Sequence, residues 1–195
     1  MKIKFVTTNS AKVALAKERL AKYGISPVQE SIELEENRSI DVENVALYKT
    51  KQALKKISEP FLIEDSAFYI ECLSGFPGTF IKLAFDVLGE EKICKLVKDE
   101  ENRKAYVKSV LVYGNPKTGK NKIFTGVFNG LVSDIPKGEN SRGWKIVRLF
   151  IPKGSTKTLA EFDNSEWQKF LNDFQKNDHF EKFGKWISQT TTYAS

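Results

Sequence analysis

The chain has 195 residues, a length that suits a single domain, 1–195, able to bury roughly 70% of the surface that its unfolded form exposes. No apolar run approaches the ~20 residues that span a bilayer, and no charged-then-apolar leader is visible, which favours a cytoplasmic protein and argues against a membrane protein. The net charge of +6 comes from 31 Lys and Arg residues spread along the chain, which does not indicate a nucleic-acid polymer as partner and suits a cleft for a small polyanion. Cys72 and Cys94 lack C-x-x-C spacing, so neither a zinc site nor a disulfide is predicted.

The first elements in the chain are a strand, a polar turn and a helix. Residues 2–6 alternate and then become apolar, as in a strand, and Thr7-Thr8-Asn9-Ser10 then offers side chains that cap a helix start. The helix that follows carries an apolar stripe and ends at Gly24. The stripe consists of Val13, Ala16, Leu20 and Tyr23. Because such a junction directs backbone N–H groups and a helix dipole at one point, it predicts an anion site.

A second strand and a second helix come next, with a lysine in an unusual place. Residues 27–34 suit a strand, and residues 41–58 suit a helix that follows an acidic cluster. The apolar face of that helix consists of Val42, Val45, Ala46, Ala53 and Ile57. Lys49 falls on the same face, where its charge costs free energy unless it reaches a cleft or an acidic partner. The alternative is a lysine at the edge of the stripe that extends its ammonium group to water.

Two adjacent acids interrupt the apolar run that opens the stretch 61–78. Glu64 and Asp65 follow Phe61-Leu62-Ile63 directly, and Ser66 comes next. Neighbours on a strand face opposite ways, so in a continuing strand at least one acid would point toward the core. We therefore expect the strand to end here, at the edge where open α/β sheets bind their ligands. Gly75-Phe76-Pro77-Gly78 then predicts a tight turn.

The remaining elements complete a mixed α/β domain. Two short helices, 79–88 and 90–98, are split at Gly89, and residues 106–113 and 122–132 suit an antiparallel pair of strands. A last strand is expected over 144–152. A capping box of Ser165 and Gln168 predicts a final helix. The stripe of that helix is Trp167, Phe170, Leu171 and Phe174, which we expect to be core. No internal repeat is visible.

Three of these features would converge if the early strands are neighbours in one sheet: the Thr7–Lys12 turn, Lys49 and the acids Glu64 and Asp65. Backbone amides and lysines bind phosphates, and carboxylates hold a hard cation such as Mg2+. Together they predict a site for a metal–nucleotide complex. With only His179 in the chain, a Ser or Cys nucleophile with a His base is not expected, and we place His179 at the surface or at a helix cap.

The chain resembles the inosine triphosphate pyrophosphatase family from about Lys2 to Phe162. The matching segments are Phe5-Val6-Thr7-Thr8-Asn9-Ser10-Ala11-Lys12, Leu62-Ile63-Glu64-Asp65-Ser66, Gly75-Phe76-Pro77-Gly78 with Lys82, and Leu149-Phe150-Ile151-Pro152 with Thr158-Leu159-Ala160-Glu161. Four separate matches in the right order make this a specific signal. The resemblance implies a long, curved mixed sheet flanked by helices, two lobes with a central cleft, and a homodimer. It also implies Mg2+-dependent hydrolysis of non-standard purine nucleoside triphosphates to the monophosphate and pyrophosphate.

The same resemblance assigns roles to individual residues. The triphosphate would be held by Thr7, Asn9 and Lys12, neutralised by Lys49 and Lys82, and touched by the hydroxyl of Ser66. Asp65 would bind the metal and orient or deprotonate the attacking water. Glu36 lines up with the second metal ligand, and Glu35 competes for that role because one residue is inserted nearby.

Two departures from the family concern the base. Trp144 can stack on a purine, but Val147 stands where the family has an aspartate. The segment Glu166–Asp173 replaces the one whose Arg and His read the 6-oxo edge. We therefore expect relaxed or altered base specificity. The rival hypotheses are a nucleotide-binding protein without turnover on the same fold and an RNA-associated basic domain.

Overall fold

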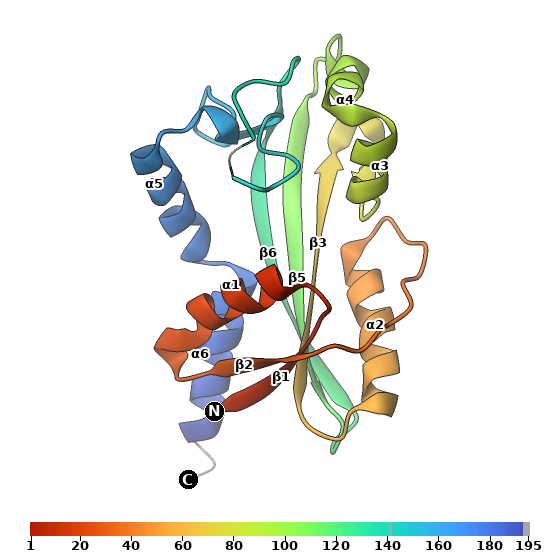
Figure 1. Ribbon diagram of the computed structural model, residues 1–195, viewed down its shortest axis with the longest axis vertical. Helices are drawn as coiled ribbons and strands as arrows, with labels where there is room; N and C mark the ends of the chain where they lie inside the picture. Colours follow the sequence, from red (N-terminus) through yellow and green to blue (C-terminus); the bar gives the residue numbers. More distant parts are fainter. Residues whose placement is uncertain (141, 193–195) are drawn as a thin grey trace. The chain divides into compact units, whose positions relative to one another are not determined.

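The computed structural model describes residues 1–140 and 142–192 and has a mixed α/β fold, as predicted (Figure 1). Seven strands form one sheet in the order β2-β1-β3-β5-β6-β7, and the short strand β4 pairs with β3. Strand β1 is parallel to both β2 and β3, whereas β4 is antiparallel to β3 and β7 is antiparallel to β6. The sheet is therefore mixed and flanked by helices.

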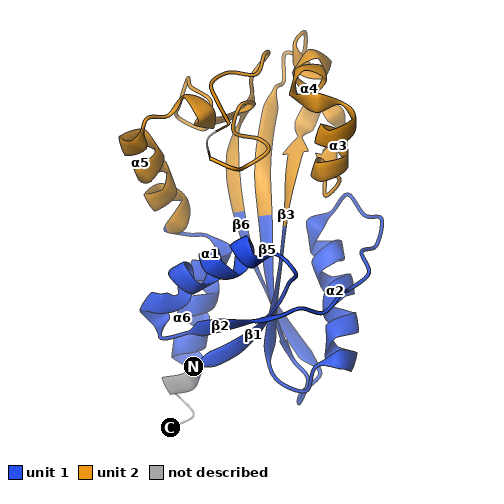
Figure 2. Cartoon of the chain, viewed as in Figure 1, with its two compact units in different colours: residues 1–65, 109–126, 176–195 blue, residues 66–108, 127–175 orange. Residues whose placement is uncertain are grey.

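The chain forms two compact units (Figure 2). Unit 1 comprises Met1–Asp65, Ser109–Gly126 and Lys176–Ser195, and unit 2 comprises Ser66–Lys108 and Val127–Gln175. Three strands, β3, β5 and β6, continue from one unit into the other. Each unit has a hydrophobic cluster of its own.

Unit 1 begins as the sequence predicts. Its elements are β1 (Lys2–Val6), α1 (Ser10–Leu20), the 3-10 turn η1 (Ala21–Tyr23), β2 (Ser26–Glu30), α2 (Val42–Lys56), the first half of β3 (Phe61–Ile70), the larger parts of β5 (Lys104–Asn115) and β6 (Lys120–Val132), and α6 (His179–Thr192). Asn9 caps α1, and Gly24 ends η1 with a φ of 66°, a left-handed conformation that favours glycine. The second strand is shorter than predicted, because only the segment 26–30 pairs with β1.

The core of unit 1 forms where the predicted helix faces meet the sheet. Val13, Ala16 and Leu20 of α1 are buried, as are all five residues predicted for the face of α2. Phe5 and Leu62 of the sheet pack in one cluster with α1. The two apolar periodicities were therefore sufficient to place both helices.

Helix α6 was not predicted. It lies beside α1 in unit 1 and buries Phe180 and Phe183 in the same core cluster (Figure 1). The spacing of Phe180, Phe183 and Ile187 is a helical apolar stripe that could have revealed it. A buried ion pair joins the two helices, with Arg19 Nη2 2.7 Å from Asp178 Oδ2. Asp178 also caps α6, because its Oδ1 accepts a hydrogen bond of 2.8 Å from the backbone N–H of Glu181.

Glu181 makes the stability of unit 1 depend on pH. Burial pushes the pKa of this carboxyl up, but hydrogen bonds from Lys22, Tyr23 and Lys185 outweigh it and lower the pKa to about 2. The stabilisation is present above the ordinary value of 4.5 and is lost as the pH falls toward 2. We expect Glu181→Gln to lower the free energy of unfolding at neutral pH and to have a shrinking effect below pH 4.5, measured by urea unfolding. A difference from wild type that stays constant over this range would contradict the assignment.

Unit 2 contains the short helices and the smaller part of the two long strands. Its elements are the rest of β3, η2 (Glu71–Leu73), β4 (Pro77–Gly78), α3 (Ile81–Val87), α4 (Gly89–Val97), parts of β5 (Lys104–Asn115) and β6 (Lys120–Val132), β7 (Phe150–Pro152), η3 (Leu159–Glu161) and α5 (Asn164–Gln175). The predicted split of two helices at Gly89 and the predicted strand pair are confirmed. The four-residue turn between β5 and β6 requires that pair to be antiparallel.

Two predictions for unit 2 are wrong in detail. The last strand covers only Phe150–Pro152, because residues 145–149 form turns in which Leu149 N–H and Phe150 N–H both bond to the carbonyl of Ile146. Helix α5 begins at Asn164, and its capping box is formed by Asp163 and Glu166 rather than by Ser165 and Gln168. Glu166 N–H donates to Asp163 Oδ1, and Asp163 N–H donates back to Glu166 Oε2.

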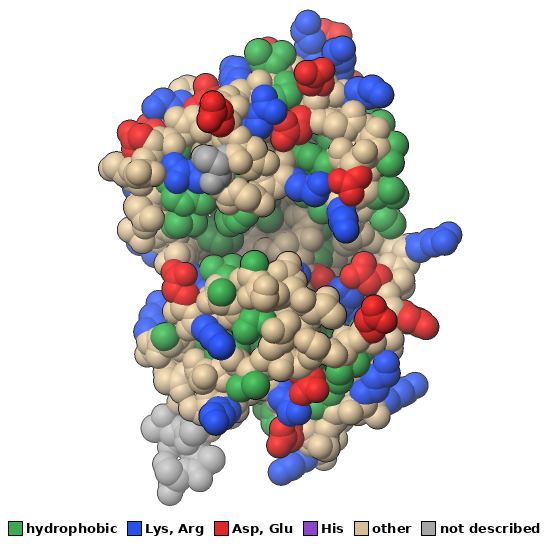
Figure 3. All heavy atoms as spheres, viewed as in Figure 1, with side chains coloured by type: hydrophobic (Ala, Val, Ile, Leu, Met, Phe, Trp, Pro, Cys, Tyr) green, Lys and Arg blue, Asp and Glu red, His purple; other side chains and the backbone are tan. Residues whose placement is uncertain are grey.

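The charge distribution on the surface and the state of the cysteines match what the composition predicts. Acidic and basic side chains are intermixed on the visible faces of both units (Figure 3). Both cysteines are free, and Cys94 is buried. Among the described residues, no helix combines the length and the apolar character that crossing a membrane requires.

Candidate functional site

Strand β3 does not end at the two acids, which corrects the prediction. It runs from Phe61 to Ile70, and Glu64 and Asp65 lie within it. What ends is its neighbour: the register of β1 with β3 stops at Phe5 opposite Leu62, and β1 itself stops at Val6. The strand can continue because each acid has an ammonium partner, one from α1 and one from α2, which removes the cost of an unpaired buried charge.

Lys12, in the first turn of α1, is the partner of Glu64. Its Nζ lies 3.0 Å from Glu64 Oε2 and donates a hydrogen bond of 2.9 Å to the Glu64 carbonyl. The same Nζ is 3.7 Å from Asp65 Oδ1. The Glu64 side chain is only 7% exposed, so this ion pair is held away from bulk water.

Lys49, in the middle of α2, is the partner of Asp65. Its Nζ donates a hydrogen bond of 2.9 Å to Asp65 Oδ1 and lies 2.6 Å from Glu36 Oε1. Lys49 has a side chain that is 13% exposed, and that of Asp65 is 15% exposed. Lys49, the charged residue on the apolar face of α2, therefore has acidic partners. This favours a lysine paired with acids over one that only extends its ammonium group to water.

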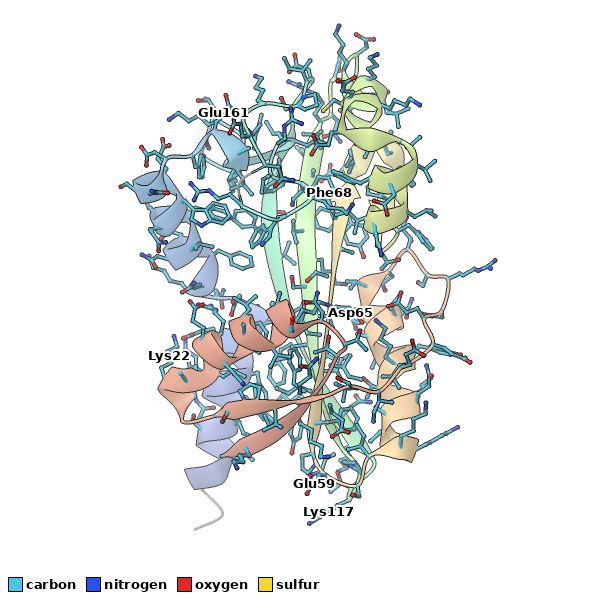
Figure 4. All side chains as sticks on the ribbon, in the orientation of Figure 1. Lys22, Glu59, Asp65, Phe68, Lys117 and Glu161 are labelled. Carbon is cyan, nitrogen blue, oxygen red and sulfur yellow. The ribbon has the colours of Figure 1, made fainter. Side chains whose placement is uncertain are left out.

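The charges around Asp65 favour the uptake of a proton or a cation by its carboxylate. Burial raises the pKa of the Asp65 carboxyl, and the attraction of Lys12 and Lys49 offsets only part of that effect. Burial alone would lower the pKa of the Lys12 ammonium group, but Glu64 and Asp65 raise it above its ordinary value. Asp65 Oδ2 is buried without a hydrogen-bond partner in the described part of the chain. One oxygen of Asp65 thus has a lysine partner, and the other has none among the described residues. Figure 4 labels Asp65 among the side chains of the described residues.

The polar turn before α1 is built as a helix cap. Asn9 Oδ1 accepts hydrogen bonds from the backbone N–H groups of Ala11, at 2.9 Å, and Lys12, at 3.4 Å. Thr7 Oγ1 accepts one from the Asn9 N–H at 3.1 Å. This network fixes the start of α1 and thereby places Lys12 over the acids of β3. Asn9 keeps its side-chain NH2 group as a donor.

Glu36 and Asp65 are the two carboxylates that meet at Lys49. Oxygen donors from one or two carboxylates, completed by phosphate oxygens, are what Mg2+ requires, so this pair fits that cation. The buried, unpartnered Oδ2 of Asp65 supports the fit. Glu36 contacts Lys49 directly, whereas Glu35 Oε2 lies 3.5 Å from the Tyr48 hydroxyl, which is longer than a normal O–H···O hydrogen bond. Within residues 1–140 and 142–192, no group of three or more acidic, His or Cys side chains could hold a metal by itself.

The other three candidate residues belong to unit 2. Ser66 follows Asp65 on β3 and is exposed, as is Lys82 on α3. Trp144 is 37% exposed, and its ring centroid lies 5.6 Å from that of Trp167 in an edge-on arrangement. The structure thus brings six of the nine sequence candidates into unit 1. These six are Thr7, Asn9, Lys12, Glu36, Lys49 and Asp65.

The two departures from the family pattern are packing residues here. Val147 is fully buried in the core cluster of unit 2. In the segment 166–173, Phe170 is buried in the same cluster and Trp167 packs against it. Arg142 covers the Trp167 ring, with its guanidinium carbon 5.0 Å from the ring centroid. Val147 and Phe170 are thus core residues of unit 2, whereas Gln168 and Lys169 of the same segment are exposed.

His179 lies neither at the surface nor at a cap, which corrects the prediction. It is the first residue of α6 and is 4% exposed, and the preceding Asp178 is the cap. Burial lowers the pKa of the imidazole, so it is neutral at physiological pH. Its ring lies 4.3 Å from that of Phe180.

Known proteins are similar in sequence to this chain over most of its length. The model of the Ham1 family matches residues 3–172. A dITP/XTP pyrophosphatase of Methanopyrus kandleri is 36% identical over 95% of this chain and 96% of its own, and one of Pyrococcus horikoshii is 39% identical over 85% and 87%. An inosine triphosphate pyrophosphatase of Yarrowia lipolytica is 32% identical over 92% and 95%.

Solved structures share the fold. The Ham1 protein of Staphylococcus aureus superimposes with a TM-score of 0.76 over all of both chains, at 19% identity. A HAM1 protein of Coxiella burnetii also has a TM-score of 0.76, over 99% of each chain, at 24% identity.

Proposed function

The chain belongs to the Ham1 family, and from this premise we propose that it hydrolyses nucleoside triphosphates to nucleoside monophosphate and pyrophosphate. Non-standard purine nucleotides are the first candidate substrates, because the similar proteins are named for dITP, XTP and inosine triphosphate. The observation that carries the proposal is Asp65: a half-buried carboxylate with one oxygen on Lys49 and the other buried without a partner among the described residues.

The described residues suggest a division of labour in unit 1. Asp65, whose pKa is raised by burial, would accept the proton of the water that attacks the α-phosphorus. Lys12 and Lys49 would neutralise the triphosphate and the charge that develops on the departing pyrophosphate. The Thr7–Asn9 turn would hold the phosphates at the start of α1, where backbone N–H groups favour an anion. Glu36 and Asp65 would hold Mg2+, which polarises the phosphoryl oxygens when bound.

The base preference that we propose rests on the two places where this chain departs from the family pattern. Val147 and Phe170 are core residues here, and apolar side chains cannot read a keto oxygen. We therefore propose relaxed or altered base specificity. The roles of Ser66, Lys82 and Trp144, the homodimer and the action of 1–195 as one functional domain stay predictions from the resemblance.

A panel of nucleotides tests the proposal. The purified protein with Mg2+ is expected to release pyrophosphate from at least one of ITP, dITP, XTP and the standard triphosphates, and chelation of the metal is expected to abolish that release. Pyrophosphate and inorganic phosphate are separated by ion chromatography. Absence of pyrophosphate from every nucleotide would contradict the proposed function and would favour the rival, a nucleotide-binding protein without turnover.

A further inference from the structure

Ammonium groups occupy two of the carboxylate oxygens at which a metal ion would bind, Glu36 Oε1 and Asp65 Oδ1, whereas Asp65 Oδ2 has no partner among the described residues. Lys49 Nζ bridges two carboxylates, 2.6 Å from Glu36 Oε1 and 2.9 Å from Asp65 Oδ1. Lys12 Nζ likewise lies between two carboxylates, 3.0 Å from Glu64 Oε2 and 3.7 Å from Asp65 Oδ1. Three carboxylates against two ammonium groups leave one negative charge in the cluster, so it is nearly neutral without any ligand.

We propose that Lys49 is a resident cation that stands in for the divalent metal between Glu36 and Asp65 while no nucleotide is bound. The free metal ion is then a weak ligand of this protein, and the true ligand is the metal–triphosphate complex. This inference rests on the proposed function. It adds that the metal ion binds together with the triphosphate and not before it.

The physical reason is competition for the same atoms. A divalent ion held by Glu36 and Asp65 would lie close to the Lys49 ammonium group, which already contacts both carboxylates, and the like charges would repel each other. A triphosphate removes the conflict, because its oxygens attract the ammonium group and leave the carboxylates to the metal. Metal and triphosphate therefore raise each other's affinity, and the coupling is reciprocal.

The decisive experiment measures metal binding without nucleotide. Mn2+ serves as the probe, and free Mn2+ is quantified by electron paramagnetic resonance during titration of the wild type and of Lys49→Met. We expect the variant to bind Mn2+ at least about tenfold more tightly than the wild type, because the resident cation is gone while both carboxylates remain. Lys51→Met is the matched control, since it removes the same charge from an exposed position of the same helix and should leave the Mn2+ affinity within about twofold.

Two further variants keep the test decisive. Lys49→Arg retains the cation and should bind Mn2+ as weakly as the wild type. Adding Glu36→Gln to Lys49→Met should remove the gained affinity, which places the ion between the two carboxylates. Circular dichroism melting checks that each variant is folded. Equal Mn2+ affinity in the wild type and folded Lys49→Met, or an equal gain in Lys51→Met, would overturn the inference.

The Mn2+ titration and the nucleotide panel test separate claims, and either can fail without the other. A wild type that releases pyrophosphate, combined with a Lys49→Met variant of unchanged Mn2+ affinity, would overturn the resident cation and leave the proposed function intact. A wild type without turnover, combined with a tighter Lys49→Met variant, would overturn the function and leave the metal-competing role of Lys49 in place.

Discussion

Asp65→Asn is expected to lower kcat/KM for the best nucleotide by about a thousandfold or more, because the side chain loses the carboxylate that takes the proton of water. The amide keeps the shape of the residue and an oxygen toward Lys49, so the protein should stay folded. Binding of an α,β-methylene nucleotide analogue, measured by calorimetry, is expected to change far less than turnover.

The matched control is Asp99→Asn, which makes the same chemical change at an exposed position. It should leave both turnover and analogue binding at the wild-type level. An Asp65→Asn variant that turns over at a rate close to that of the wild type would remove Asp65 from the catalytic role. A wild type that binds the analogue but never turns over nucleotide would favour the rival binding protein.

Arg19→Met is expected to have the largest effect on stability, lowering the free energy of unfolding by about 3–5 kcal/mol, since it leaves the Asp178 carboxylate buried without its partner. Both side chains of this pair are almost fully buried, at 6% and 2% exposure. Urea unfolding at neutral pH, followed by fluorescence and circular dichroism, measures the change. Loss of the pair should also loosen α6, because Asp178 caps that helix.

Lys17→Met provides the comparison, because it removes a positive charge from an exposed position of the same helix. Its effect should stay within about 0.5 kcal/mol. The double variant Arg19→Met with Asp178→Asn should be more stable than the sum of the single effects predicts, because no charge is left unpaired. Additive effects would show that Arg19 and Asp178 act independently.

Local patterns predicted most of unit 1. The capping side chain of Asn9 and the apolar stripes of α1 and α2 were sufficient to place these elements, because each depends on residues that are close in sequence. The charge on the face of α2 left open whether Lys49 reaches a cleft or a partner or extends to water, and Asp65 is its partner. The partner's identity depends on the sheet order, which brings β3 next to β1 and which no local pattern encodes.

The wrong predictions have the same physical origin. The sequence rule that two adjacent acids end a strand fails at Glu64 and Asp65, because their partners Lys12 and Lys49 come from two other elements, α1 and α2. His179 is buried because it begins α6, and a lone polar residue gives no sign of burial in the sequence unless its helix is recognised. The cap of α5 was shifted because Asp163 and Glu166 satisfy the capping pattern as well as Ser165 and Gln168 do.

The most direct test of the central claim follows water into the products. The wild type is incubated with Mg2+ and its best nucleotide in water enriched in the heavy isotope of oxygen, and the monophosphate and pyrophosphate are analysed by mass spectrometry. Attack on the α-phosphorus predicts equal amounts of the two products, with the label in the monophosphate alone. Label in the pyrophosphate, or release of inorganic phosphate as the primary product, would contradict the mechanism assigned to Asp65.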